Sequence, residues 1–292
     1  MLRQSLDAVA RISPGFRRLM MRTWYESLVL LDRDKDITFM NYGYSGLGAV
    51  ENHLALNDAE QANRYSIQLY QHVAGAVDLR DKDVAEIGSG RGGGAAYISR
   101  NLKPRSMVGI DISRKAIEFC NRYYSNGNLY FSHGDAENVP LADDAVDAVI
   151  NLESSHCYGS MTRFLSEVRR VLRPGGYFLF SDHRDRNQTA VLHAQLNQAG
   201  LKLVTETDIT DNVVRALELD NDRKQQLIKR KCPKVLRKEA GEFAALKGTR
   251  TFEAFKRGYS RYLSFVLQKQ SEPPAVAGLP EKVQAKGFGY AA

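Results

Sequence analysis

From position 83 to about 210, short apolar runs alternate with longer stretches in which apolar residues recur at helical spacing. The short runs are rich in Val, Ile, Leu and Phe, which predicts strands. Strands that alternate with helices are typical of an α/β fold with a parallel sheet and helices on both of its faces. The predicted strands are 84–87, 106–110, 129–132, 145–151, 176–181 and 201–207. The predicted helices are 94–102, 114–124, 160–172 and 188–199.

The pattern differs before and after this region. Residues 1–35 and 58–77 have apolar positions near helical spacing, which predicts amphipathic helices ahead of the sheet. A charged helical segment follows position 210, and a period-2 run from 259 predicts a late strand. The predicted organisation is an N-terminal helical cap (1–79), a core (80–210), a helical insert or lid (211–258), the final strand of the core (259–270) and a flexible tail (271–292).

Composition places the chain among ordinary globular proteins. Its 292 residues are 43% hydrophobic, which is enough to bury a core, and no apolar stretch approaches the length of a membrane span. Cys120, Cys157 and Cys232 stand far apart, which favours a reducing compartment and argues against a structural zinc site. The arginine-rich N-terminus has no compact apolar segment of the secretory type. We therefore expect a cytoplasmic protein.

The net charge of +7 makes nucleic acid a partner to consider. Much of the excess lies in a basic run at 223–238, and no zinc-finger spacing, aromatic RNA-binding strand or helix-turn-helix accompanies it. We therefore expect no nucleic-acid partner. The simplest interpretation of the run is a solvated helix face, and a docking patch for an acidic carrier protein or an anionic lipid surface is the alternative.

Candidate chemistry first appears at the end of the first predicted strand. The strand residues 84–87 are followed by the glycine-rich stretch 88–94 and then by a predicted helix. Such a turn lets a ligand approach the backbone closely and meet unpaired N–H groups. Gly88, Gly90 and Gly93 satisfy the dinucleotide pattern G-x-G-x-x-G. The same stretch also reads Glu-x-Gly-x-Gly-x-Gly from Glu86, which is typical of a different cofactor.

Two acids follow the next predicted strands, at the sheet edge where ligands of such folds bind. Asp111 stands about 20 residues beyond the glycines, the usual position of an acceptor for ribose hydroxyls. It is also placed to cap the helix that begins near Ser113. Asp135 follows the third strand, where a carboxylate can accept a hydrogen bond from the amine of adenine.

Taken in this order, the motifs resemble the class I S-adenosylmethionine-dependent methyltransferases. The motifs are Glu86-x-Gly88-x-Gly90-x-Gly92, Asp111, Gly134-Asp135-Ala136, Asp147 and Leu172-Arg173-Pro174-Gly175-Gly176. A closer resemblance is to bacterial natural-product O-methyltransferases of the phthiotriolone/phenolphthiotriolone dimycocerosates type. It rests on residues 41–44, 92–98, 134–140 and 151–158. The resemblance implies a Rossmann-like, seven-stranded, mostly parallel sheet, S-adenosylmethionine as cofactor, and methyl transfer.

The resemblance also implies roles for single residues. Glu86 would contact the methionine amino end of the cofactor, and Asn151 would lie beside its methionine portion. Asp111 would hold the ribose hydroxyls, while Asp135 and the backbone of Ala136 would contact adenine. The implied cofactor-binding set is Glu86, Gly88, Ser89, Gly90, Asp111, Ile112, Asp135, Ala136 and Asn151. A dinucleotide cofactor would explain only the glycines and Asp111, and it would leave Glu86, Asp135 and the residues after the fourth strand without roles.

A histidine after the fourth strand is the preferred general base. His156 has a side chain whose pKa suits proton transfer near neutral pH, and it follows the strand at which the substrate should lie. Alternatively, it orients a loop or bonds a buried carbonyl group. His183, after the fifth strand, is the second candidate, and the neighbouring Asp182 could orient a histidine or cap the next helix. Because no recognisable metal spacing ties Glu153 to Asp182, we expect no metal.

The acceptor is inferred from the segments around the core. Helices at the N-terminus and in the insert would roof the pocket, which suits a hydrophobic specialised metabolite such as a polyketide, a polyketide-peptide or a lipid-like alcohol. Tyr42, Tyr44 and Tyr158 are the candidate lid and substrate contacts. Methylation at a carbon or nitrogen atom, and a cofactor-binding scaffold with non-methylating activity, remain as alternatives.

Overall fold

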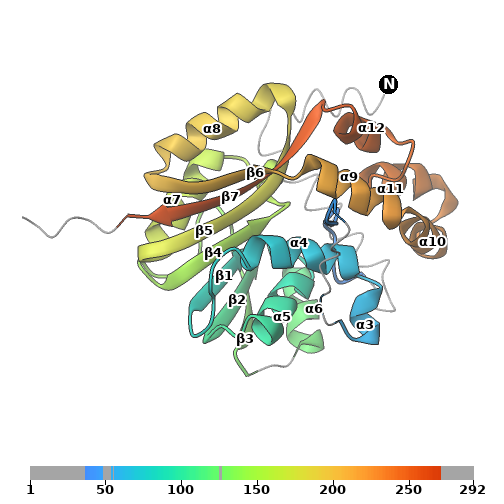
Figure 1. Cartoon of the computed structure of the whole chain (residues 1–292). Coiled ribbons are helices and arrows are strands. Elements are labelled where there is room, and N and C mark those ends of the chain that lie inside the picture. The colour runs from blue at the N-terminus through green and yellow to red at the C-terminus, as the bar shows by residue number, and fades with distance from the viewer. Residues whose placement is uncertain (1–36, 49–53, 55, 125–126, 271–292) are drawn as a thin grey trace, which may run out of the picture.

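The computed structural model describes residues 37–48, 54, 56–124 and 127–270 (Figure 1). Their centre is a seven-stranded sheet in the order β3-β2-β1-β4-β5-β7-β6. β7 runs antiparallel to both of its neighbours, and the other strand pairs are parallel. This arrangement confirms the predicted fold class. The strands are β1 Asp83–Ile87, β2 Ser106–Asp111, β3 Leu129–His133, β4 Val146–Leu152, β5 Leu172–Asp185, β6 Leu201–Asp208 and β7 Ser260–Lys269.

The fifth strand is longer than the sequence predicts at both ends. It begins at Leu172, which pairs with Val146, and the ladder shifts register before Ala148 pairs with Tyr177. The Pro174–Gly175 turn, which follows the predicted helix 160–172, therefore lies within an irregularity of β5. At the other end β5 continues beside β7 to Asp185. Asp182 and His183 are consequently strand residues, and the prediction that they follow the strand is wrong.

Helices cover both faces of the sheet (Figure 1), and a hydrophobic layer lies between the sheet and the helices on each face. One layer packs α4, α5, α6, α9 and α12 against the sheet, and the other packs α7 and α8. The alternation of side chains along β1 explains the division, because Val84 belongs to the first layer and Ala85 to the second. The helices of these layers are α4 Arg64–Ala74, α5 Gly93–Asn101, α6 Arg114–Tyr123, α7 Met161–Val171, α8 Thr189–Gln198, α9 Thr210–Leu219 and α12 Arg250–Lys256.

The segment predicted as one helix over 58–77 is divided. A short helix, α3 (Asp58–Gln61), ends before Asn63, whose backbone (φ −113°, ψ 16°) is not helical, and α4 begins at Arg64. The predicted helices within 1–35 and the predicted tail 271–292 lie outside the described residues. Within the described part of the chain, no helix has the length and apolar character needed to cross a bilayer.

The insert between β6 and β7 is helical, as predicted. It contains α9, α10 (Asn221–Lys231), α11 (Arg237–Phe243) and α12. Its first helix is tied to the strap at residues 38–45, because Ser45 N–H donates to the Asn212 carbonyl (3.2 Å) and Asn212 Nδ2 donates to the Ser45 carbonyl (2.9 Å). Lys224 Nζ donates to the Tyr42 carbonyl (3.2 Å). The strap and the insert thus lie together beside the ends of β1 and β4.

Candidate active site

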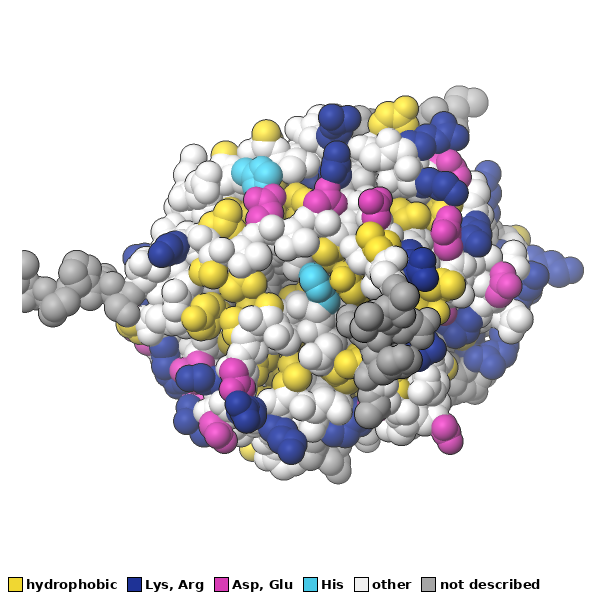
Figure 2. Space-filling view, viewed as in Figure 1, with side chains coloured by type: hydrophobic (Ala, Val, Ile, Leu, Met, Phe, Trp, Pro, Cys, Tyr) yellow, Lys and Arg dark blue, Asp and Glu magenta, His cyan; other side chains and the backbone are white. Residues whose placement is uncertain are grey.

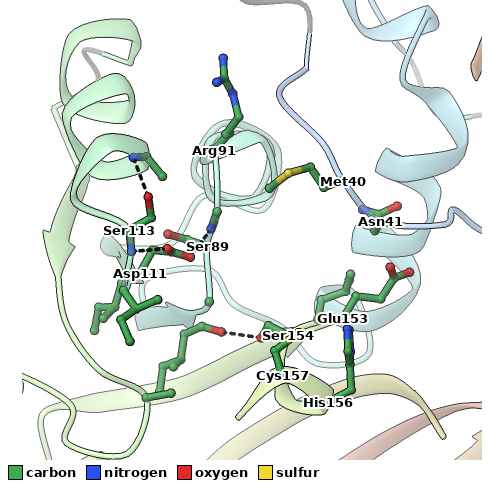
Figure 3. A pocket seen from close by; sticks show the side chains of 18 of the residues that line it. Met40, Asn41, Ser89, Arg91, Asp111, Ser113, Glu153, Ser154, His156 and Cys157 are labelled. Carbon is green, nitrogen blue, oxygen red and sulfur yellow. Dashed lines mark hydrogen bonds between the residues drawn. The ribbon is translucent and has the colours of Figure 1, made fainter. Parts of the chain in front are cut away.

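A cavity opens at the carboxyl ends of the parallel strands (Figure 3). Its walls come from the glycine turn after β1, from residues 110–113 after β2, from residues 134–137 after β3 and from residues 152–158 after β4. The strap, through Phe39, Met40 and Tyr42, and α11, through Phe243, complete the lining. Ligands of doubly wound sheets bind at this edge, so the cavity is the candidate functional site.

The glycine turn brings backbone to the cavity surface. Gly88 has φ 81° and Gly90 has φ 52°, a region that favours glycine. A Cβ atom at Gly88 would also lie 2.3 Å from Ser154 Oγ. The Ser89 side chain is buried, and its Oγ has no hydrogen-bond partner among the described residues. An unpartnered hydroxyl group at a cavity wall is suited to a polar ligand.

Asp111 joins this turn to the second strand. Its Oδ2 accepts a hydrogen bond from Gly90 N–H (2.8 Å), and its Oδ1 accepts one from Ser113 N–H (2.8 Å). Each carboxylate oxygen therefore keeps capacity to accept a further bond from a ligand hydroxyl group. The helix that follows is capped by Ser113 Oγ, so the capping role considered for Asp111 is taken by Ser113. Burial raises the pKa of Asp111 from its ordinary value.

Most of the predicted cofactor residues line the cavity. Asp135 and Ala136 lie in the wall after β3, where Asp135 Oδ1 accepts from Glu137 N–H (2.9 Å). The lining members of the predicted set are Gly88, Ser89, Gly90, Asp111, Ile112, Asp135 and Ala136. The structure thus brings these predicted residues together at one cavity, and the role of each side chain toward a ligand stays a prediction.

Glu86 and Asn151 lie behind this wall rather than in it. Glu86 is 1% exposed, accepts a hydrogen bond from Tyr70 Oη (2.6 Å), and has its pKa raised to about 8 by burial. Asn151 is fully buried, and its Nδ2 donates to the Ile87 carbonyl (2.7 Å). Tyr70, which the sequence did not single out, lines the cavity in front of Glu86. Cofactor contacts of Glu86 and Asn151 remain predictions.

The far end of the cavity contains a histidine–aspartate pair. His156 Nδ1 lies 2.8 Å from Asp182 Oδ1, and the His156 side chain is 22% exposed while that of Asp182 is fully buried. Burial alone would lower the pKa of His156, but Cys157 and Asp182 raise it, and it ends well above the ordinary value. Because Nδ1 faces the aspartate, a proton from a ligand would have to go to Nε2, the other nitrogen of the ring.

Asp182 is held by donors on every side. Burial would raise its pKa, but His156 and Arg184 lower it well below the ordinary value, so the carboxylate is ionised. Its five donors are Ser155 Oγ, the N–H and Nδ1 of His156, His183 N–H and Arg184 Nη1. His156, Asp182 and His183 have ligand atoms close enough together to share a metal ion. With so many donors already bound, the Asp182 oxygens are better suited to fixing His156 than to ligating a cation.

His183, the second candidate base, lines the cavity beside His156, with ring centroids 4.4 Å apart. Tyr42 packs against His183 at 5.6 Å between centroids. Tyr158 lines the cavity and bonds Ser154 Oγ (2.8 Å). Tyr44 is stacked on His72 (4.6 Å) and is not among the residues that line the cavity. The structure therefore brings Tyr42 and Tyr158, but not Tyr44, to the site.

The sequence underestimated Glu153. It was considered only as a metal ligand, yet it lines the cavity next to His156 (Figure 3). Its pKa is raised to about 7 by burial, although Tyr42 N–H and Tyr262 Oη lower it. The sequence signal that could have identified Glu153 as a site residue is its position directly after the apolar fourth strand.

The strand order, the glycine turn after β1 and the acid after β2 define a Rossmann-like protein that binds a nucleoside cofactor. Residues 85–180 match the model of a methyltransferase domain. The chain is 36% identical to a fatty-acid O-methyltransferase of Mycolicibacterium smegmatis, over 82% of this chain and 86% of that protein. It is 35% identical to a phthiotriol/phenolphthiotriol dimycocerosates methyltransferase of Mycobacterium tuberculosis, over 91% of this chain and 97% of that protein.

The chain belongs to the class I S-adenosylmethionine-dependent methyltransferases, as the sequence motifs predicted, and its cofactor is S-adenosylmethionine. The cavity fits this cofactor, since Asp111 presents acceptor capacity to hydroxyl groups and Ser89 Oγ lacks a partner among the described residues. A solved structure of the [4+2]-cyclase SpnF has the same fold, with a TM-score of 0.64 and 18% identity over 89% of this chain and 97% of that chain. The fold alone therefore does not specify the reaction.

Proposed function

We propose that the enzyme transfers a methyl group from S-adenosylmethionine to the hydroxyl group of a hydrophobic, lipid-like acceptor, with His156 as the general base. The observation that carries the proposal is the His156–Asp182 pair at the end of the cavity away from Asp111. The cofactor supplies an activated methyl group. The chain must orient the acceptor and take up its proton.

The proton path follows from the orientation of the imidazole ring. Asp182 Oδ1 bonds Nδ1, so neutral His156 carries its proton on Nδ1 and offers Nε2 as the acceptor. When Nε2 takes the hydroxyl proton, the positive charge that forms lies against the ionised carboxylate of Asp182. His156 and the buried Asp182 are thus arranged to stabilise the charged form of the base.

The acceptor end of the cavity is lined by apolar and aromatic side chains. Tyr42 of the strap contributes to it, with its ring packed against His183, and Phe39, Met40 and Phe243 add further apolar lining to the cavity. Such a lining suits an acceptor with a large apolar body and one polar group. The relatives named above for a fatty acid and for phthiotriol support a lipid-like acceptor.

The basic run at 223–238 supports, more weakly, an acceptor delivered by an acidic carrier protein. Figure 2 shows Lys and Arg side chains gathered at the right of this face, over α10 and α11. Lys224 is turned inward toward the Tyr42 carbonyl, whereas Lys229 and Arg230 are exposed. A carrier would therefore meet the C-terminal half of α10.

His156→Ala tests the proposal. We expect methylation of hydroxylated acceptors to fall by about 10²–10⁴-fold, because the base is lost. Binding of S-adenosylhomocysteine, measured by calorimetry, should be retained, since His156 lies at the acceptor end. Full turnover in this variant would instead favour methylation at a carbon or nitrogen atom, for which orientation suffices. The failure of labelled methyl groups to reach any hydroxylated, amine or carbon acceptor would favour a non-methylating scaffold.

A further inference from the structure

Glu153 is a cavity residue that the proposed methyl transfer does not use. It directly follows β4, and its backbone has φ 48°, an uncommon conformation for a residue other than glycine. Such a conformation costs about 1–3 kcal/mol and persists where surrounding contacts fix it. Here the Glu153 N–H donates to the Ser181 carbonyl (2.9 Å) on β5. The side chain is thereby fixed beside His156 at the acceptor end of the cavity (Figure 3).

The two carboxyl oxygens of Glu153 have different environments. Oε1 accepts hydrogen bonds from Tyr42 N–H (2.7 Å) and from Tyr262 Oη (2.7 Å). No described residue donates to Oε2. A carboxyl proton resides on the oxygen that accepts fewer hydrogen bonds, so neutral Glu153 is a donor through Oε2. Ionised Glu153 presents a negative charge at the same place.

The charges around Glu153 are of both signs. The pKa of its carboxyl group is raised to about 7, and burial is the main cause. The negative charge of Asp182 also raises this pKa. The hydrogen bonds from Tyr42 N–H and Tyr262 Oη lower it, and so does His156. The groups that face it come from the strap, α4, η1 (Ser155–Cys157), β5, β7 and α10. They are Tyr42, Tyr70, His156, Asp182, His183, Tyr262 and Lys224. Glu153 is therefore placed to change its charge within the ordinary pH range.

We propose that Glu153 is a specificity residue that controls whether a carboxylate can enter the acceptor site. Ionised Glu153 excludes a carboxylate acceptor by charge repulsion and leaves the site to hydroxyl acceptors. Protonated Glu153 donates from Oε2 to a carboxylate and admits it. The proposal rests on the proposed function, because it assumes that the acceptor's reacting oxygen lies at the end of the cavity formed by His156 and Glu153.

The two kinds of acceptor make different demands on the site. A hydroxyl group forms its new O–C bond as the S–CH3 bond of the donor breaks and S-adenosylhomocysteine leaves, and the hydroxyl proton goes to His156 Nε2. A carboxylate oxygen forms the same bond without releasing a proton, and the resulting ester is neutral. A carboxylate does, however, bring a negative charge toward Asp182 and Glu153, which protonated His156 and protonated Glu153 each offset. Because the pKa of His156 lies well above the ordinary histidine value, His156 stays protonated near pH 7, and the change in selection against carboxylates in this range comes from Glu153.

The test measures binding, so it does not depend on turnover. Decanoate and decanol are titrated calorimetrically into the protein loaded with S-adenosylhomocysteine. Above about pH 7 the affinity of the wild type for decanoate should fall by up to about tenfold per pH unit, as the protonated fraction of Glu153 falls. Decanol affinity should stay constant. In Glu153→Gln, decanoate should bind equally well at both ends of this pH range.

Two further variants sharpen the result. Tyr262→Phe removes a donor that favours ionised Glu153, so the fall in decanoate affinity should move to higher pH. Glu218→Gln alters an acid that pairs with Lys256 at the surface, and it should behave as the wild type does. Tyr262→Phe also provides the test if Glu153→Gln fails to fold.

The remaining outcomes contradict the inference. In the first, the affinity of the wild type for decanoate does not change with pH. In the second, Glu153→Gln shows the same pH dependence as the wild type. In the third, Glu153→Gln folds but does not bind decanoate. Loss of decanol binding in every form would instead count against the proposed function, because a hydroxylated apolar acceptor would then not enter the cavity.

Discussion

His156 Nδ1 lies 2.8 Å from Asp182 Oδ1, although the two residues come from separate segments, the short turn η1 after β4 and the strand β5. The contact forms because β4 and β5 are parallel neighbours, with Leu152 opposite Ser181. A residue just beyond the end of β4 thereby meets one that is still inside β5. The register of β4 and β5 therefore fixes the position of the His156 ring at the proposed acceptor end of the cavity.

Asp182→Asn should reduce turnover without removing the cofactor. The variant keeps the size of the side chain but loses the charge that stabilises protonated His156, so kcat should fall by about 10²-fold or more. The amide NH₂ group would also face donors, which should cost about 1–3 kcal/mol of unfolding free energy. Steady-state kinetics, chemical unfolding and S-adenosylhomocysteine binding measure the three quantities. An unchanged kcat would contradict the assignment.

The pH dependence of hydroxyl methylation should show the raised pKa of His156. The imidazole must be neutral to accept a proton, so kcat/KM should rise with pH until the pH passes that pKa, which lies above the ordinary histidine range. Asp182 is one cause of the rise in pKa, so Asp182→Asn should move the midpoint to lower pH. A midpoint that is the same in both proteins would show that another group controls the profile.

The glycine turn predicts a difference between two glycine substitutions. Gly88 and Gly248 both have positive φ (81° and 80°), but a Cβ atom would meet Ser154 Oγ at 2.3 Å in the first case and open space in the second. Gly248→Ala should therefore cost only the backbone strain, about 1 kcal/mol. Gly88→Ala should also displace the turn and weaken S-adenosylhomocysteine binding by tenfold or more, as calorimetry would show. Equal cofactor binding in the two variants would exclude the predicted role of the turn.

The fold was predictable because its strands are short apolar runs separated by helices, and this pattern is local in the sequence. Gly88, Asp111 and Asp135 could likewise be located, since each follows a strand and the carboxyl ends of parallel strands share one edge.

The length of β5 was not predictable in the same way. Its continuation through Asp182 depends on pairing with Leu263 of β7, which is distant in sequence. The buried positions of Glu86 and Asn151 depend on which side of the wall each side chain faces. The importance of Glu153 depends on Tyr42 and Tyr262, which come from opposite ends of the chain. These are tertiary relationships that no local pattern expresses.

The contact between the strap and the insert gives the last prediction. Asn212→Ala removes the hydrogen bond from Asn212 Nδ2 to the Ser45 carbonyl (2.9 Å) but leaves the backbone bond from Ser45 N–H in place. The loss of about 1 kcal/mol should loosen the strap that brings Met40 and Tyr42 to the cavity. We expect the KM for the acceptor to rise by roughly fivefold, with kcat at saturation and S-adenosylhomocysteine binding little changed. Asp211→Ala, a neighbouring change on the exposed side of α9, is the matched control. If the two variants have the same KM, the strap does not depend on this contact to shape the acceptor site.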